Sequence, residues 1–174
     1  MKQPIKLAVL VNRFKNAFRK RPKYIVDNWK WVIRHTLLPW FIFPMTIRHK
    51  NGARFYLSKD PVDDRILFGI YQNHYNVYFP PEIVSLPSDA LILDIGAHHG
   101  YYSIAAIFQY PQSKIMAIEP NPLALKLLKH NLKINSVKDR VEVICAGIGT
   151  NQGEGWLIKN PGGSWGNYIS ETIP

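Results

Sequence analysis

Apolar side chains recur every three or four positions in two stretches within residues 1–40. The first stretch, residues 5–21, contains Leu7, Leu10, Val11, Phe14 and Phe18. The second stretch contains Val26, Trp29, Ile33 and Leu37. This spacing predicts two amphipathic helices with their apolar stripes on one face. Pro22 and Pro39 end the two patterns, because proline cannot continue a helix.

Two strand-like runs follow, over residues 46–57. They are separated by Asn51-Gly52, a pair typical of a type I′ turn, in which both central residues have positive φ. We therefore expect a β-hairpin here. A helical or irregular lead-in is expected over residues 61–87, where prolines interrupt the pattern.

The most regular pattern lies in residues 90–146, where short apolar runs alternate with helical stretches. The strand-like runs cover residues 90–95, 114–119 and 141–146, with a helix predicted after each of the first two. This order predicts an α/β domain with a parallel sheet and right-handed crossovers. The first run is continuously apolar, which is typical of a strand buried on both faces. Asn121 suits the cap and Pro122 the first turn of the second helix.

Candidate ligand-binding residues gather where the first two strands end. Asp94 closes the first strand, and the turn from Gly96 to Gly100 leads into a helix. Glycine at these two positions permits a sharp turn and a close approach of ligand or helix. The carboxylate of Asp94 and the N–H groups of the helix N-terminus can hold a polar ligand group. Glu119 ends the second strand, where a carboxylate can accept the ribose hydroxyls of a nucleoside.

The spacing of the glycines distinguishes two classes of nucleoside cofactor. Dinucleotide-binding turns contain G-x-G-x-x-G, which cradles a pyrophosphate. This chain has only Gly96 and Gly100, spaced G-x-x-x-G, with Asp94 two residues before the first. An acid at that position suits a cationic ligand such as S-adenosylmethionine and would repel a pyrophosphate. A nicotinamide-dependent enzyme is therefore the weaker interpretation.

Four stretches of the chain resemble the FkbM-type family of S-adenosylmethionine-dependent methyltransferases. They are Leu93–Ser103, Ala117–Pro122, Leu128–Asn135 and Val141–Gly149. The run I-E-P-N-P over residues 118–122 is more specific than the glycine turn. The resemblance implies a Rossmann-like methyltransferase fold with a parallel sheet, preceded by a helical and hairpin N-terminal extension. It also implies O-methylation of a hydroxyl on a sugar or natural product.

The resemblance assigns roles to individual residues around the cofactor S-adenosylmethionine. Asp94, Gly96 and Gly100 would surround its methionine part, and Glu119 would contact its ribose. Ala97 and Asn121 complete the expected cofactor-binding set. His98 stands where the family commonly has asparagine. No catalytic residue is assigned, because the general base would come from a part of the family's domain that the resemblance does not cover.

The resemblance covers residues 91–174 and includes only three strands of a seven-stranded domain. We therefore expect a C-terminally truncated domain, a fragment of the active enzyme, whose first strand is an open edge with an uncovered apolar face. The predicted division is a basic, aromatic-rich helical extension (1–45), a hairpin and lead-in (46–90) and a partial S-adenosylmethionine-binding domain (91–174).

The charge of the chain is concentrated at its N-terminus. The net charge is +10 over 174 residues, yet residues 1–50 hold twelve basic side chains and one acidic, and the remainder holds ten and eleven. A basic amphipathic helix beside tryptophan and phenylalanine suits an anionic membrane surface. Nucleic acid is not expected as a partner, because residues 51–174 are nearly neutral and contain no recognised binding module. The expected methyl acceptor is a small molecule or glycan.

The longest apolar run has nine residues, Leu37–Met45, whereas a membrane-spanning helix needs about 20. We therefore expect a cytoplasmic protein. Residues 1–45 are expected either to pack as a helical cap on the catalytic domain with their basic face in solvent, or to make the protein peripheral at an anionic membrane surface. The alternative function is a non-catalytic remnant that acts as a membrane-surface or interaction module.

The histidines, the cysteine, two asparagines and one tryptophan are expected to have structural roles only. His98 and His99 are adjacent in a turn with no third ligand nearby in the sequence, so no metal site is expected. The single cysteine, Cys145, excludes an intramolecular disulfide and, in an apolar run, indicates a small buried side chain. Asn131 and Asn135 are expected to cap or solvate a helix end, and Trp156 to pack in the core.

Overall fold

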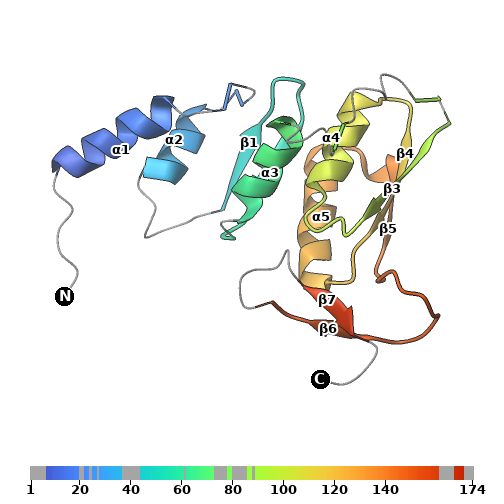
Figure 1. Ribbon diagram of the computed structural model, residues 1–174. Coiled ribbons are helices and arrows are strands. Elements are labelled where there is room, and N and C mark those ends of the chain that lie inside the picture. Colours follow the sequence, from blue (N-terminus) through green and yellow to red (C-terminus); the bar gives the residue numbers. More distant parts are fainter. Residues whose placement is uncertain are drawn as a thin grey trace. The chain divides into compact units, whose positions relative to one another are not determined.

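The structure is a computed structural model, which describes residues 7–19, 22–23, 25–26, 28–36, 44–60, 62–72, 78–79, 86–87, 89–160 and 167–170. The chain divides into two compact units, residues 1–61 and 62–174 (Figure 1). The first unit contains α1 (Leu7–Arg19), α2 (Asn28–Thr36), β1 (Met45–Arg48) and β2 (Arg54–Leu57). Among the described helices, none has the length and apolar character needed to cross a membrane.

The two predicted helices of the first unit are present, but the apolar stripe predicted for α2 is wrong. Trp29 is 63% exposed, whereas Trp31 and Val32 are buried. This helix contacts β1, and the Lys30 ammonium donates to the Thr46 carbonyl. Packing against α1 and the hairpin therefore selects the face of Trp31 and Val32. Leu37, and the side chains of Leu7, Leu10 and Phe14 in α1, lie outside the described residues.

The predicted hairpin is present, although its turn differs from the expected type. Strands β1 and β2 pair antiparallel, and the His49 N–H donates to the Ala53 carbonyl at 2.8 Å. Three residues form the loop, and only Gly52 has positive φ, at 96°. The type I′ prediction is wrong because the Asn51 side chain makes a local turn of its own, accepting from the Ala53 N–H at 3.1 Å.

The second unit contains a three-stranded parallel sheet in the order β3-β4-β5. The strands are β3 (Leu91–Ile95), β4 (Lys114–Ile118) and β5 (Val141–Ile144). The connecting helices α4 (Tyr101–Gln109) and α5 (Pro122–Ile134) lie on the same side of the sheet (Figure 1). The predicted α/β, Rossmann-like architecture is confirmed. The remaining elements are α3 (Val62–Gln72), the short 3-10 helix η2 (Lys138–Arg140), and the antiparallel pair β6 (Trp156–Ile158) and β7 (Tyr168–Ser170).

The two faces of β3 have different surroundings. Ile92 and Asp94 alternate with Leu91, Leu93 and Ile95, which are 56%, 54% and 61% exposed. The prediction that this strand is buried on both faces is therefore wrong. In the part of the chain that the structure describes, β3 pairs only with β4. The expected open edge with an exposed apolar face is thus observed.

Apolar side chains of α4, α5 and β4 form the core of the second unit. Ile104, Ile115, Ala117 and Leu128 are almost completely buried. This packing aligns the carboxyl ends of β3 and β4, which are paired in parallel with Ile95 opposite Ile118. The turns that follow these two strands therefore meet at one edge of the sheet, where ligand sites of open α/β sheets lie.

Outside the predicted site, the structure differs from the sequence-based expectations for Cys145, Trp156 and Asn131 and agrees with the one for Asn135. Cys145 and Trp156 are exposed rather than buried, because Cys145 follows the last residue of β5 and Trp156 begins the small antiparallel pair. Asn135 is the C-cap of α5, as expected. The prediction for Asn131 is wrong. The residue lies within α5 rather than at its end, and its side chain is completely buried.

Candidate functional site

The turn between β3 and α4 has an unusual backbone. Gly96 and Gly100 have φ of 76°, and His98 has φ of 49°. Positive φ is uncommon for any residue other than glycine and persists where surrounding contacts hold it. Gly100 is also the N-cap of α4. The glycine positions of the sequence motif are therefore explained by backbone conformation.

Most N–H groups of this turn are bonded within the protein. The N–H groups of Gly96 and Ala97 both donate to the Ile118 carbonyl, at 2.9 and 3.0 Å. The Gly100 N–H donates to the Ala97 carbonyl at 2.7 Å. These contacts shape the turn and dock it onto the end of β4. The turn itself consequently offers few backbone donors to a ligand.

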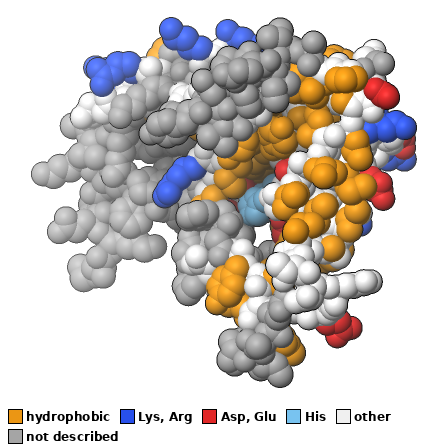
Figure 2. Space-filling view, turned by 45° about the vertical axis from the view of Figure 1, so that its right-hand side comes forward, with side chains coloured by type: hydrophobic (Ala, Val, Ile, Leu, Met, Phe, Trp, Pro, Cys, Tyr) orange, Lys and Arg blue, Asp and Glu red, His pale blue; other side chains and the backbone are white. Residues whose placement is uncertain are grey.

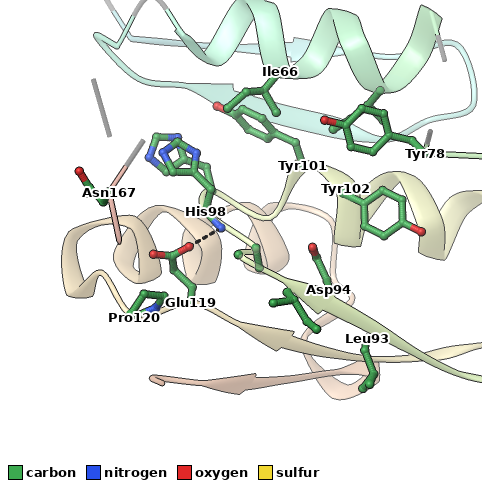
Figure 3. Close-up of a pocket in the computed structure, with 15 residues that line it drawn as sticks. Ile66, Tyr78, Leu93, Asp94, His98, Tyr101, Tyr102, Glu119, Pro120 and Asn167 are labelled. Carbon is green, nitrogen blue, oxygen red and sulfur yellow. Dashed lines mark hydrogen bonds between the residues drawn. The ribbon is translucent and has the colours of Figure 1, made fainter. Parts of the chain in front are cut away.

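Glu119 joins the two turns through its carboxylate. Oε2 accepts from the His98 N–H at 2.8 Å (Figure 3). Oε1 accepts from the Asn121 N–H, also at 2.8 Å. The residue is 7% exposed and lines a cavity. A carboxylate has about four acceptor positions, so each oxygen keeps capacity for a further donor. Glu119 can therefore accept hydroxyl groups of a ligand while it holds the turns together.

Asp94 is held by the first turn of α4. The Ser103 hydroxyl donates to its Oδ2 at 2.5 Å, and the Ser103 backbone bonds to the same carboxyl group. Burial raises the pKa of Asp94 above its ordinary value, the Ser103 contacts oppose the rise, and the nearby Glu119 charge adds to it. The sequence did not identify Ser103 as a site residue. Ser103 is the third residue of α4, and the N–H group at this position of a helix is one that a capping acceptor commonly binds.

Ser103→Ala is expected to raise the pKa of Asp94 further, because it removes a hydrogen bond that favours the carboxylate. A raised carboxyl pKa means that the folded state binds the proton more tightly than the unfolded state, so stability falls as pH rises from the unfolded pKa through the folded one. The variant should widen this pH window and cost about 1 kcal/mol at pH 7. Carbon-detected NMR titration of Asp94 and urea unfolding at several pH values measure both effects.

Ser113→Ala is the matched control for this prediction. Ser113 is equally buried, and its hydroxyl bonds to the Tyr110 carbonyl instead of to an acid. That control should lose stability without moving the Asp94 titration. An Asp94 midpoint that stays in place or falls in Ser103→Ala contradicts the assigned contact.

A cavity of about 620 Å³ lies at the carboxyl ends of β3 and β4. Figure 2 shows a histidine recessed between hydrophobic and acidic side chains on this part of the surface. The described residues that line the cavity are Ile66, Ile70, Tyr78, Leu93, Asp94, Ile95, Gly96, Ala97, His98, His99, Tyr101, Tyr102, Glu119, Pro120 and Asn167. They include two acids and two histidines, but neither lysine nor arginine.

The cavity brings together four of the six predicted cofactor residues, namely Asp94, Gly96, Ala97 and Glu119. Gly100 and Asn121 are not part of its described lining. The Asn121 side chain caps α5 by accepting from the Leu123 N–H at 3.0 Å, as predicted from the sequence. These two residues therefore shape the turns on either side of the cavity.

An aromatic wall completes the cavity and was missed by sequence reasoning. Tyr78 and Tyr102 lie with ring centroids 5.8 Å apart, and Ile66 and Ile70 of α3 line the same space (Figure 3). Burial and the neighbouring Asp94 charge raise the pKa of Tyr102. Tyr78 lies in the lead-in segment and Tyr102 in α4, so only the tertiary structure brings these rings together.

Asp63 of α3 supplies an acid beside His98 and His99 that the sequence did not reveal. Possible ligand atoms of the three residues lie within 4.8 Å of one another. However, the two imidazole rings are stacked with centroids 3.7 Å apart. Two histidines on one zinc ion, with Zn–N of about 2.0–2.1 Å, would place the ring centres roughly 5 Å apart. The geometry favours a hydrogen-bonded pair, His99 Nδ1 to Asp63 Oδ1 at 2.7 Å, over metal coordination.

Comparisons with known proteins identify related sequences. The family profile of the TRM5/TYW2 methyltransferase domain matches residues 46–155. Methyltransferase sdnD of Sordaria araneosa is 36% identical over 72 residues, which cover 41% of this chain and 28% of that protein. The chain therefore spans little more than a quarter of this relative.

Two solved structures illustrate the structural similarity. Pyrococcus horikoshii TYW2 in complex with MeSAdo is 22% identical in sequence, with a TM-score of 0.43. The match covers 62% of this chain and 38% of the TYW2 chain. Methyltransferase FkbM from Methylobacillus flagellatus has 14% identity and a TM-score of 0.40, covering 91% and 36%.

Proposed function

The chain belongs to the TRM5/TYW2 methyltransferase domain family, and from this premise we propose that the whole protein transfers a methyl group from S-adenosylmethionine to a hydroxyl oxygen of a small acceptor. The domain is an S-adenosylmethionine-dependent methyltransferase domain. The assignment to the FkbM type is the finer part of the proposal and is supported by the four stretches of sequence described above. A sugar or natural product is the proposed class of acceptor.

The residues at the cavity suit a cationic nucleoside. Asp94 and Glu119 bring negative charge to a space that contains no described lysine or arginine. A Cβ at Gly96 would meet no heavy atom within 4 Å, so ligand atoms can approach the backbone there. When bound, S-adenosylmethionine supplies an electrophilic methyl group. The chain's own residues then contribute by binding and orienting, which accelerates a bimolecular reaction strongly.

The observation that carries the acceptor class is the composition of the cavity wall. Tyr78, Tyr101 and Tyr102 together with isoleucines form an apolar, aromatic side, and the polar side is acidic. Such a wall suits a neutral or cationic small molecule, because aromatic and apolar surface buries it with few polar groups to orient it. Acidic side chains with no neighbouring cation in the described lining disfavour a phosphate-bearing acceptor.

A nucleic acid is the second candidate acceptor, favoured by the basic N-terminal segment. Residues 1–50 hold twelve basic side chains, and Lys15, Arg19 and Lys23 are exposed. Clustered cations of this kind bind phosphate backbones. Nucleic acid was not expected as a partner from the sequence, and the match to the TRM5/TYW2 family weakens that expectation. An anionic membrane is the other surface that residues 1–45 could contact.

A two-stage experiment tests the proposal. Calorimetric titration with S-adenosylmethionine, with NAD as the negative control, should show binding of the first alone. Incubation with S-adenosylmethionine labelled on the methyl group then offers a set of hydroxyl-bearing sugars and natural products, and total tRNA in parallel. Label in the small-molecule fraction supports the proposal, whereas label in tRNA replaces it with the second candidate.

The same experiment, with a vesicle-binding assay added, distinguishes the proposed enzyme from a non-catalytic membrane-surface or interaction module. No binding of S-adenosylmethionine overturns the proposed function. If the chain also co-sediments with anionic vesicles and not with neutral ones, a membrane-surface module explains it better. Binding of S-adenosylmethionine together with equal, negligible sedimentation in both vesicle types would remove the membrane role and leave the enzymatic proposal in place.

A further inference from the structure

A buried pair of polar side chains connects α3 to the β3–α4 turn. Asp63 lies in the first turn of α3 and is completely buried, and His99 is 4% exposed. The distance from His99 Nδ1 to Asp63 Oδ1 is 2.7 Å. We propose that Asp63, acting through His99, is a positioning residue that holds the turn in its cofactor-binding conformation. This inference rests on the proposed binding of S-adenosylmethionine.

The backbone of His99 is held from a second direction. Its carbonyl accepts from the Asn131 side-chain amide of α5 at 3.0 Å. The turn is therefore held by α3 through the His99 ring and by α5 through the His99 carbonyl. These two contacts join residues 36 and 32 positions apart in the sequence. Neither partner belongs to the glycine motif.

His99 in turn supports the residue that contacts Glu119. The His98 ring stacks on the His99 ring, and the His98 N–H donates to Glu119 Oε2 at 2.8 Å. His98 carries the only positive φ among the non-glycine residues of the turn, and such a conformation persists only where neighbours hold it. A displaced His99 ring therefore releases both the stacking and the backbone conformation that presents this N–H to Glu119.

The pairing suits a positioning role because both groups are buried. With a proton on Nδ1, the imidazole donates to the Asp63 carboxylate, which fixes the ring orientation. Removing either partner leaves the other buried without its hydrogen bond, and the turn then gains alternative conformations. The apparent affinity for a ligand falls in proportion to the fraction of molecules that keep the competent conformation.

The test compares two neighbouring acids of α3, with S-adenosylhomocysteine as the calorimetric probe. Asp63→Ala should weaken binding about tenfold, which corresponds to about 1.4 kcal/mol. Asp64→Ala removes the same charge from the same helical turn and leaves the hydrogen bond between Asp63 and His99 in place, so it should change the affinity less than about twofold. Titrations are run well below the unfolding temperature of each variant, so that global unfolding does not contribute.

A second pair of variants keeps the test informative if Asp63→Ala fails to fold. In His99→Asn, the side-chain amide can replace the Nδ1 donor toward Asp63, whereas His99→Leu has a similar size and no donor. We expect the asparagine variant to retain affinity within about threefold and the leucine variant to lose about tenfold. A purely structural role would lower the unfolding temperature of both and leave the affinity of the folded molecules equal.

The outcomes distinguish this inference from the proposed function. If the unaltered chain does not bind S-adenosylhomocysteine, the proposed function fails. If it binds and Asp63→Ala binds equally well, the positioning role is overturned while the function stands. Equal losses in Asp63→Ala and Asp64→Ala, or in His99→Asn and His99→Leu, also overturn it. In the double variant Asp63→Ala/His99→Leu, the loss should not exceed that of either single variant by more than about twofold.

Discussion

Glu119→Ala is expected to lose at least about 100-fold in affinity for S-adenosylhomocysteine and to be destabilised by about 2–6 kcal/mol. The stability cost follows from two backbone N–H groups, those of His98 and Asn121, that would lose their acceptor; each such loss costs about 1–3 kcal/mol. The affinity cost follows from removing a carboxylate that we expect to accept ligand hydroxyls, since hydrogen bonds to charged groups contribute about 1.5–3 kcal/mol each. Calorimetry and urea unfolding measure the two effects separately.

Glu142→Ala is the control, because this exposed acid of β5 lies outside the described cavity lining. Its affinity and stability should stay close to those of the unaltered chain. Glu119→Gln keeps the size of the side chain but turns an amide NH₂ toward one of the two N–H groups, so it should fall between wild type and alanine. Unchanged binding in a folded Glu119→Ala variant would remove Glu119 from the cofactor site.

The two glycines of the turn should respond differently to alanine. A Cβ at Gly100 would lie 3.0 Å from Leu128 Cγ, in a fully buried part of α5, whereas a Cβ at Gly96 meets open space. Both positions have φ of 76°, which costs an L-residue about 1–2 kcal/mol. Overpacking adds about 1–3 kcal/mol at Gly100 alone, so Gly100→Ala should be destabilised by roughly 2–5 kcal/mol and Gly96→Ala by about 1–2.

The effect on binding should have the opposite order. Gly96 lines the cavity and Gly100 does not, so Gly96→Ala is expected to weaken S-adenosylhomocysteine binding by more than about tenfold. Gly100→Ala should bind more tightly than Gly96→Ala once both are folded. Denaturant unfolding and calorimetry on the same two samples check the pair. Equal stability losses, or stronger binding by Gly96→Ala, contradict the assigned contacts.

Local patterns were sufficient to predict the order of elements in residues 90–146. Alternating apolar runs and helical stretches, a proline after an asparagine cap, and glycines at a strand–helix turn act over short distances. Helix capping and turn conformation depend mainly on such neighbours. For this reason the position of the turn and the acids that end β3 and β4 could be read from residues 94–122.

Long-range packing explains where the predictions were wrong. The buried face of α2 was misplaced because contact with α1 and the hairpin selects Trp31 over Trp29. Cys145 was expected inside because its neighbours are apolar, yet β5 ends one residue earlier. Asn131 resembled a helix-end residue, but in the fold it reaches the His99 carbonyl. For α2 and Asn131 the decisive contact lies on another element.

The sequence by itself determined the class of fold and the residues from which a nucleoside site is built, because strand, turn and helix signals are local and the two acids follow directly from strand ends. Only the tertiary structure decided how those residues are used. It bonded Asp94 to Ser103, engaged both Glu119 oxygens with the two turns, and brought Asp63 against His99 across 36 positions of chain. The contact between Asp63 and His99 forms only when α3 packs against the β3–α4 turn, and no spacing rule along the chain encodes it.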